Sequence, residues 1–225
     1  MIIAIDGPSG AGKGTVARAV AASLQFRHVD SGAMYRAVGW KALRDGVSLG
    51  DDQAVAGVAS ASVIEVGSDR VTIDGIDVTR EIRTPEIDRA AASVARLPAV
   101  RAVLVGQQRQ MGLTGAIVME GRDIGTVVFP QADVKIYLDA APEERARRRA
   151  NDPAHTGGPV AVSEVATLLT ERDRSDSTRA VSPLYAAADA AVIDTTGRSV
   201  EEVVSDVLKI VKSQLSKLNS QERPS

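Results

Sequence analysis

The feature that most constrains this chain is a glycine-rich loop directly after a short apolar run at its start. The loop covers residues 7–15 and reads Gly-Pro-Ser-Gly-Ala-Gly-Lys-Gly-Thr, and an apolar helical pattern through Val16, Val20 and Leu24 follows it. A strand, a loop of this kind and a helix form a phosphate-binding loop, in which backbone N–H groups and the helix N-terminus surround phosphate oxygens. The sequence therefore predicts a nucleotide-binding α/β protein.

The loop predicts ATP as its ligand, with the lysine at the β- and γ-phosphates. Its ATP-binding residues would be Gly7, Pro8, Ser9, Gly10, Ala11, Gly12, Lys13, Gly14 and Thr15. The general motif has a hydroxyl residue for Mg²⁺ where Gly14 stands, and Thr15 follows one position later. Which hydroxyl serves the metal therefore stays open, with Thr15 as the candidate. A glycine-rich turn that binds nothing is the alternative.

Short apolar runs recur at residues 2–5, 116–119, 134–138 and 190–193, separated by helical patterns, as buried parallel strands require. Residues 48–83 break this rhythm with small antiparallel strand patterns, so we expect a core of 1–47 and 84–225 with an inserted subdomain of 48–83. Turn residues predict a lid at 150–162, and residues 219–225 read as a frayed tail. Ser199 and Glu202 form a capping box before the last helix.

Composition narrows the classes of function. The chain has no cysteine and two widely separated histidines, so thiol chemistry and a zinc site are excluded. A net charge of -2 predicts no nucleic acid or membrane partner, and no apolar run reaches the roughly 18 residues of a membrane helix. We expect a cytoplasmic monomer.

Acidic and basic residues follow the predicted strand at residues 116–119. Glu120 stands at its end, where an acid can order Mg²⁺ through water, although a capping or ion-pairing role is the alternative. Arg122 and Asp123 come next and would point into the crevice at the carboxyl ends of the strands.

Further arginines lie on either side of the expected lid. A helix that begins at Pro142 carries the lid arginines Arg145, Arg148 and Arg149. Residues 171–179 hold three arginines and three acids, a pattern that alone is typical of a solvated helix face. Together the two segments suit phosphoryl transfer, because guanidinium groups stabilise the charge on the phosphoryl oxygens.

Four motifs, at residues 7–15, 30–36, 120–130 and 176–181, make the chain resemble the bacterial cytidylate kinases from its first strand to its last helix. The resemblance implies transfer of the ATP γ-phosphoryl group to CMP or dCMP with Mg²⁺, in pyrimidine nucleotide metabolism. It also implies a P-loop three-layer α/β fold with a central parallel five-stranded sheet, an inserted monophosphate-binding subdomain and a short lid.

The resemblance also assigns residues for CMP. Ser31, Arg101 and Asp123 would contact cytosine; Tyr35, Arg172 and Asp176 would surround the ribose; Arg36, Arg122 and Arg179 would hold phosphate. Lys13, Arg122 and Arg179 would be catalytic. Ala92 stands where the family often has a serine near the base, which departs from the pattern.

Two other functions stay open. Another small-molecule P-loop kinase, acting on UMP, AMP or a shikimate-like acid, would keep the loop and read its acceptor differently. A regulatory nucleotide-binding protein would bind ATP without transferring phosphate. The guanine-reading Asn-Lys-x-Asp pattern is absent, which disfavours a GTP switch.

Overall fold

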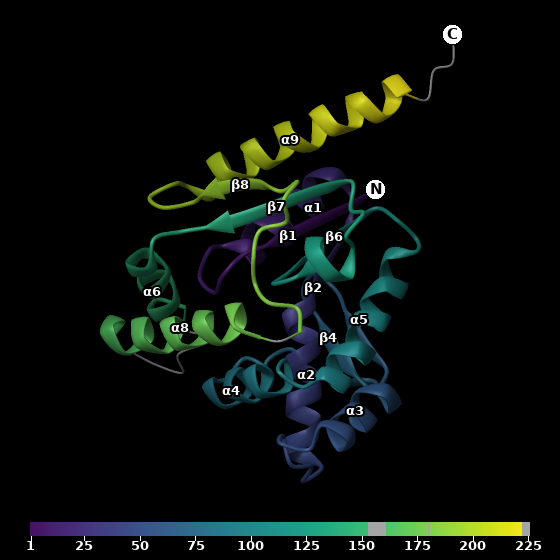
Figure 1. Cartoon of the computed structure of the whole chain (residues 1–225), viewed down its shortest axis with the longest axis vertical. Coiled ribbons are helices and arrows are strands. Elements are labelled where there is room, and N and C mark those ends of the chain that lie inside the picture. Colours follow the sequence, from purple (N-terminus) through teal and green to yellow (C-terminus); the bar gives the residue numbers. More distant parts are fainter. Residues whose placement is uncertain (153–160, 180, 222–225) are drawn as a thin grey trace.

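A five-stranded parallel sheet forms the centre of the computed structural model, which describes residues 1–152, 161–179 and 181–221. Its strands are β1 (Ile2–Asp6), β2 (Arg27–Asp30), β6 (Ile117–Gly121), β7 (Val134–Asp139) and β8 (Ala191–Asp194). They lie in the order β2-β6-β1-β7-β8 (Figure 1). The central parallel sheet predicted from the sequence is confirmed.

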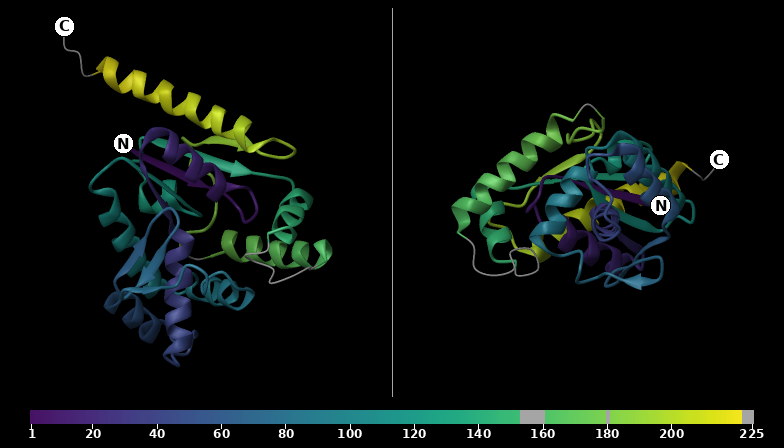
Figure 2. Two further views of the ribbon diagram at one scale, coloured as in Figure 1. Left: turned by 180° about the vertical axis from the view of Figure 1, so that it is seen from behind. Right: turned by 90° about the horizontal axis from the view of Figure 1, so that it is seen from below.

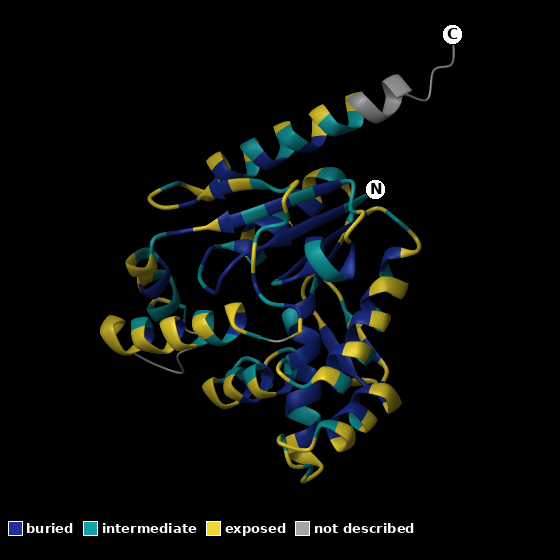
Figure 3. Ribbon diagram, in the orientation of Figure 1, coloured by how far each residue is buried: buried dark blue, intermediate teal, exposed yellow. Residues whose placement is uncertain are grey.

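Helices cover both faces of this sheet, which gives three layers (Figures 1 and 2). On one face, α1 (Lys13–Leu24) and α9 (Val200–Gln221) pack on Ile3, Ile5 and Val118. On the other, α5 (Pro98–Gly112) and the π-helical turn η1 (Ile124–Val128) pack against Ala4 and Met119. The central strands β1 and β6 are buried on both sides, as the dark ribbon at the centre of Figure 3 shows, whereas the edge strand β8 exposes Val192 and Asp194.

A second, antiparallel sheet lies in the segment that breaks the α/β rhythm. It consists of β3 (Ile64–Val66), β4 (Val71–Ile73) and β5 (Ile76–Asp77), and α3 (Asp52–Ala61) precedes it. These small antiparallel strands were predicted, whereas α3 was not. Their core is shared with α2 (Ser31–Arg44), α4 (Pro85–Val94) and α5, because one apolar cluster joins all of them. The subdomain boundaries at 48 and 83 stay a prediction.

Helix starts follow the local sequence signals. Pro85, Pro98 and Pro142 lie in the first turns of α4, α5 and α6 (Pro142–Ala150), where a missing N–H is tolerated. Ser199 and Glu202 each accept the other's backbone N–H, so the capping box before α9 is confirmed.

The elements around the expected lid are α6 and α8 (Val162–Ser177), which pack side by side (Figure 2). Most of the predicted lid, 153–160, lies outside the described residues, as do residues 222–225 of the predicted tail. Within the described part of the chain, no helix is both long and apolar enough to cross a membrane.

Candidate functional site

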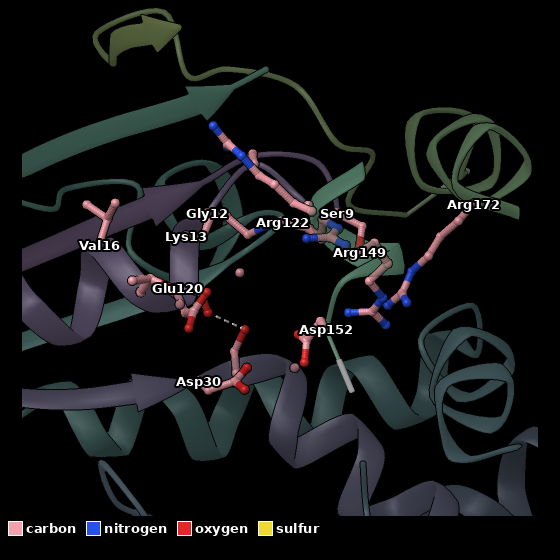
Figure 4. Close-up of a pocket in the computed structure, with 18 of the residues that line it drawn as sticks. Ser9, Gly12, Lys13, Val16, Asp30, Glu120, Arg122, Arg149, Asp152 and Arg172 are labelled. Atoms are coloured by element: carbon pink, nitrogen blue, oxygen red, sulfur yellow. Dashed lines mark hydrogen bonds between the residues drawn. The ribbon is translucent and has the colours of Figure 1, made fainter. Parts of the chain in front are cut away.

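A cavity of about 680 Å³ opens at the carboxyl ends of β1, β2 and β6, between the phosphate loop, α2, α4, α6 and α8. Its volume is within the usual range of small-molecule sites, roughly 300–1,000 Å³. Figure 4 shows a close-up of this region: Glu120 and Asp30 lie on one side, and Arg122, Arg149 and Arg172 on the other. The cavity therefore has an acidic part beside a strongly basic part.

The phosphate loop takes the conformation that the motif predicts. Gly10 and Gly12 have φ of 81° and 86°, in the left-handed region that glycine tolerates without strain. Lys13, the first residue of α1, donates from Nζ to the carbonyl oxygen of Pro8 at 2.7 Å. Burial, and next the positive charge of Arg122, lower the pKa of Lys13 well below its usual range. A bound phosphate would reverse that effect by supplying negative charge.

Nineteen of the residues predicted for the site line this cavity: Ser9, Gly10, Ala11, Gly12, Lys13, Gly14, Thr15, Ser31, Tyr35, Arg36, Arg101, Glu120, Arg122, Asp123, Arg148, Arg149, Arg172, Asp176 and Arg179. The sequence had placed them in six separate stretches of chain. The fold thus brings the loop, the strand-end residues and the arginines of α6 and α8 together.

Gly7, Pro8 and Arg145 do not line the cavity. A side chain at Gly7 would overlap the carbonyl oxygen of Leu138, so this residue packs against β7. Arg145 donates from Nη1 to Ser9 O at 3.2 Å and also pairs with Asp173. Its guanidinium thereby ties the phosphate loop to α6 and α8 instead of facing the cavity.

Arg122 and Arg179 meet on one carboxylate. Arg122 donates from Nε to Asp176 Oδ2 and from Nη1 to Gly7 O, each at 2.9 Å, and Arg179 pairs with Asp176 Oδ1. Arg122 and Arg179 hold the pKa of Asp176 below its ordinary value, although burial alone would raise it. Asp176 is buried, so the solvated-face interpretation of residues 171–179 is wrong for this side chain.

The turn after β6 is anchored from β1. Asp6 accepts the backbone N–H groups of Ile124 at 2.8 Å and Gly125 at 2.7 Å. Asp123, just before them, pairs with Arg101 of α5, and both side chains are buried. Nearby, Ser31 Oγ donates to the carbonyl oxygen of Glu120 at 2.6 Å. These contacts fix the direction of Asp123 before any ligand binds.

A second set of arginines faces the cavity from the other side. Arg36 donates from Nε to Asp88 at 3.1 Å and lies 3.4 Å from Asp30, while Arg149 also pairs with Asp88. Burial lowers the pKa of Arg172 to about 10, and the structure gives its guanidinium no ion pair within the described residues. This concentration of positive charge suits a polyphosphate.

The acidic part of the cavity fits Mg²⁺. Glu120 is buried, and a Cβ at Gly14 would lie 3.0 Å from its Oε1, so the carboxylate sits against the start of α1. No cluster of three possible ligands occurs among the described residues. Mg²⁺ commonly needs only one or two carboxylates with water and phosphate oxygens, and Glu120 and the exposed Thr15 can supply protein oxygens here.

Sequence reasoning missed Asp30, Glu144 and Asp152, which line the cavity, and Asp6 and Asp88, which hold groups around it. Asp30 caps α2 by accepting from Ala33 N and stands inside the recognised motif at residues 30–36, so the sequence could have predicted it as a site residue. Asp6 and Asp88 act on partners far along the chain. No local pattern marks such partners.

Comparisons with known proteins agree on one family. The family model described as cytidylate kinase matches residues 3–213. The cytidylate kinase of Solibacter usitatus is 48% identical over 96% of this chain and 94% of its own length, and that of Pelotomaculum thermopropionicum is 50% identical over 94% and 96%. The chain also matches 42% of a bifunctional pantoate ligase/cytidylate kinase from a Nostoc species at 48% identity.

Solved structures support the fold. A gluconokinase from Sinorhizobium meliloti matches with a TM-score of 0.53 and 13% identity, over 98% of this chain and 97% of its own. At this identity the likeness concerns the fold alone.

Proposed function

Because the chain belongs to the cytidylate kinase family, we propose that it transfers the γ-phosphoryl group of ATP to CMP and dCMP with Mg²⁺. The observation that carries this proposal is a single cavity with the phosphate loop at one part of its wall and the buried Arg101–Asp123 pair at another. A donor nucleotide and an acceptor base would therefore have separate sites within one enclosure.

At the donor end, residues of the phosphate loop would bind ATP. Backbone N–H groups around Gly10 and Gly12 would face its phosphates, and Lys13 would leave Pro8 O for a phosphate oxygen. Arg148, which donates to Thr195 Oγ1 at 2.9 Å, would close the wall beside the nucleotide.

At the acceptor end, Asp123 would read the base. A carboxylate accepts a hydrogen bond from the amino group of cytosine, whereas the oxygen of uracil at that position would face it unfavourably. Ser31 and Arg101 would complete the contacts with the base, and Tyr35, Arg172 and Asp176 would surround the ribose. This end of the cavity would therefore supply the base selectivity.

Between the two ends, Arg36, Arg122 and Arg179 would hold the acceptor phosphate and align its oxygen with the γ-phosphorus. Alignment and charge stabilisation supply most of the catalysis in phosphoryl transfer. Mg²⁺, held by Glu120 through water and by Thr15, would add a cation at the β- and γ-phosphates. An ionised CMP phosphate is already a nucleophile, so no side chain needs to remove a proton.

A coupled assay of ADP release against CMP, dCMP, UMP and AMP, each with an acceptor-free control, tests the proposal. CMP and dCMP should react far faster than UMP and AMP. Equal rates on all four would overturn the cytosine assignment. ATP binding without transfer to any acceptor would favour the regulatory alternative.

The division into a core of 1–47 and 84–225 and an inserted subdomain of 48–83, with a lid at 150–162, forms part of the same proposal. So do the monomeric state, the cytoplasmic location and the role in pyrimidine nucleotide metabolism.

A further inference from the structure

A histidine lies buried behind the acidic part of the cavity. His28 stands in β2, with 2% of its surface exposed, and its Nε2 lies 3.4 Å from Glu120 Oε1. Neither ring nitrogen has a hydrogen-bond partner in the described part of the chain. Burying an imidazole with both nitrogens unpaired is unfavourable, so its place next to a carboxylate calls for a physical reason.

The position of Glu120 supplies that reason. The parallel register of β2 and β6 sets Asp30 beside Glu120 and His28 beside Val118, one pleat earlier on the same side. On its far side, the Glu120 carboxylate meets the backbone at Gly14, where a Cβ would lie 3.0 Å from Oε1 and 3.7 Å from Oε2. Glu120 is thus confined between the imidazole and the first turn of α1.

This confinement also accounts for the departure of the phosphate loop from the general motif. The motif has a hydroxyl residue where this chain has Gly14. Here a Cβ at position 14 would lie 3.0 Å from Glu120 Oε1, so a side chain there would crowd the Glu120 carboxylate, which projects into the same part of the cavity as Asp30 (Figure 4). Gly14 has no side-chain oxygen, and Glu120 lies beside it. The orientation of the Glu120 carboxylate therefore sets where the protein offers an oxygen ligand next to the phosphate loop.

We propose that His28 is a positioning residue that donates from Nε2–H to Glu120 and holds its carboxylate toward the Mg²⁺ site. The inference rests on the proposed function, in which Glu120 orders the metal. A small movement of the ring and the carboxylate would align Nε2–H with Oε1 and shorten the distance from 3.4 Å to the usual N–H···O distance of about 2.9 Å. Fixing a metal-binding group through a second hydrogen bond raises metal affinity, because the group no longer has to be ordered when the ion binds.

Two substitutions separate this role from simple packing. His28→Leu introduces an apolar side chain of similar bulk and removes the donor, whereas His28→Gln keeps an N–H donor at nearly the same reach. The measurement is an electron paramagnetic resonance titration of Mn²⁺ into each protein with a non-hydrolysable ATP analogue. We expect H28L to weaken Mn²⁺ affinity roughly 10- to 100-fold, the range for such second partners. H28Q should stay within about threefold of the native protein, and CMP affinity by calorimetry should be unchanged in both.

The outcomes are distinguishable. A folded H28L protein with native Mn²⁺ affinity overturns the inference, and so does an H28Q protein as weak as H28L. Glu120→Gln, titrated in parallel, separates a failure of the metal assignment from a failure of the inference about His28. Native affinity in E120Q overturns both the metal assignment and the inference, while weakened E120Q beside a native H28L overturns the inference alone. If H28L loses the native circular dichroism spectrum, His28→Asn, too short to reach Oε1, takes its place with the same expected loss.

Discussion

Arg101 and Asp123 form an ion pair inside the cavity wall, with side chains only 3% and 8% exposed. Arg101 comes from α5, and Asp123 precedes a turn that Asp6 holds from β1. Burial raises the pKa of Asp123, and Arg101 opposes that rise. A carboxylate held in this way meets a ligand in a fixed direction, which is a requirement for reading a base by hydrogen bonds.

The first prediction concerns base selectivity. Replacing Asp123 with alanine should abolish most of the preference for CMP over UMP, because the acceptor for the cytosine amino group is lost. A hydrogen bond to a charged group contributes about 1.5–3 kcal/mol, which corresponds to roughly 10- to 100-fold in the ratio of kcat/KM values. Steady-state kinetics with both acceptors measure that ratio.

This variant needs a control, since it leaves Arg101 buried without its partner, a change that costs about 3–5 kcal/mol in typical proteins. Asp123→Asn keeps the shape and offers an N–H to the uracil oxygen, so it should shift selectivity toward UMP with less loss of stability. A folded D123A protein that discriminates as the native protein does would contradict the assignment.

The sequence predicted the centre of the fold because its signals there are local. Four of the five strands read as apolar runs, and the phosphate loop joins the first of them to a helix. The fifth strand, β2, was not located, because only Val29 in Arg27–Asp30 is aliphatic. This edge strand places Asp30 in the cavity wall and His28 beside Glu120, so half of its residues are polar groups next to the cavity and do not form an apolar run.

The missed parts of the site depend on contacts between distant segments. Asp6 reaches backbone groups of η1, and Asp88 of α4 meets arginines of α2 and α6. The charge of a side chain is visible in a sequence, but its partner is set by how the elements pack. Arg145 is the opposite case, a residue that was predicted for the site but does not line the cavity. Arg148 and Arg149 on the same helix line it, while Arg145 faces Ser9 and Asp173.

The second prediction concerns the phosphate loop. Lys13→Ala should lower kcat by roughly 10²- to 10³-fold, the usual effect of removing one electrostatic group at the transition state. CMP affinity should change little, because in the proposed function Asp123 and Arg101, and not Lys13, contact the base. Single-turnover kinetics test the loss of rate, and calorimetry tests the unchanged CMP affinity. A K13A protein with native kcat would rule out Lys13 as a catalytic residue.

The third prediction follows from the pKa of Asp6, which burial raises from 3.8 to about 6 although two backbone N–H groups oppose the rise. The folded protein binds this proton more tightly than the unfolded chain, so the contribution of Asp6 to stability falls as pH rises from about 4 to 6 and stays low above that. The expected loss is about 3 kcal/mol across this window.

Asp6→Asn tests this sign, because an amide does not titrate. Urea unfolding of both proteins at several pH values gives the difference in unfolding free energy, native minus variant. The titration of all other groups contributes equally to both proteins and cancels in this difference. This difference should fall between pH 4 and 6 and level off above it. A difference that rises with pH would mean that the two N–H donors lower the pKa of Asp6 by more than burial raises it.

The last prediction concerns Asp88, which binds Arg36 of α2 and Arg149 of α6 across the cavity. In the proposed function Arg36 binds the acceptor phosphate, so Asp88 competes with the substrate for that guanidinium. Asp88→Ala should lower the KM for CMP roughly three- to tenfold, a change of about 1 kcal/mol, and should lower the Tm of the ligand-free protein. Glu86→Ala is the matched control, since it removes the same charge from an exposed position in the first turn of α4; it should leave KM unchanged and lower the Tm less than D88A does. A raised KM in D88A would mean that Asp88 holds Arg36 in its phosphate-binding position, because competition and positioning move KM in opposite directions.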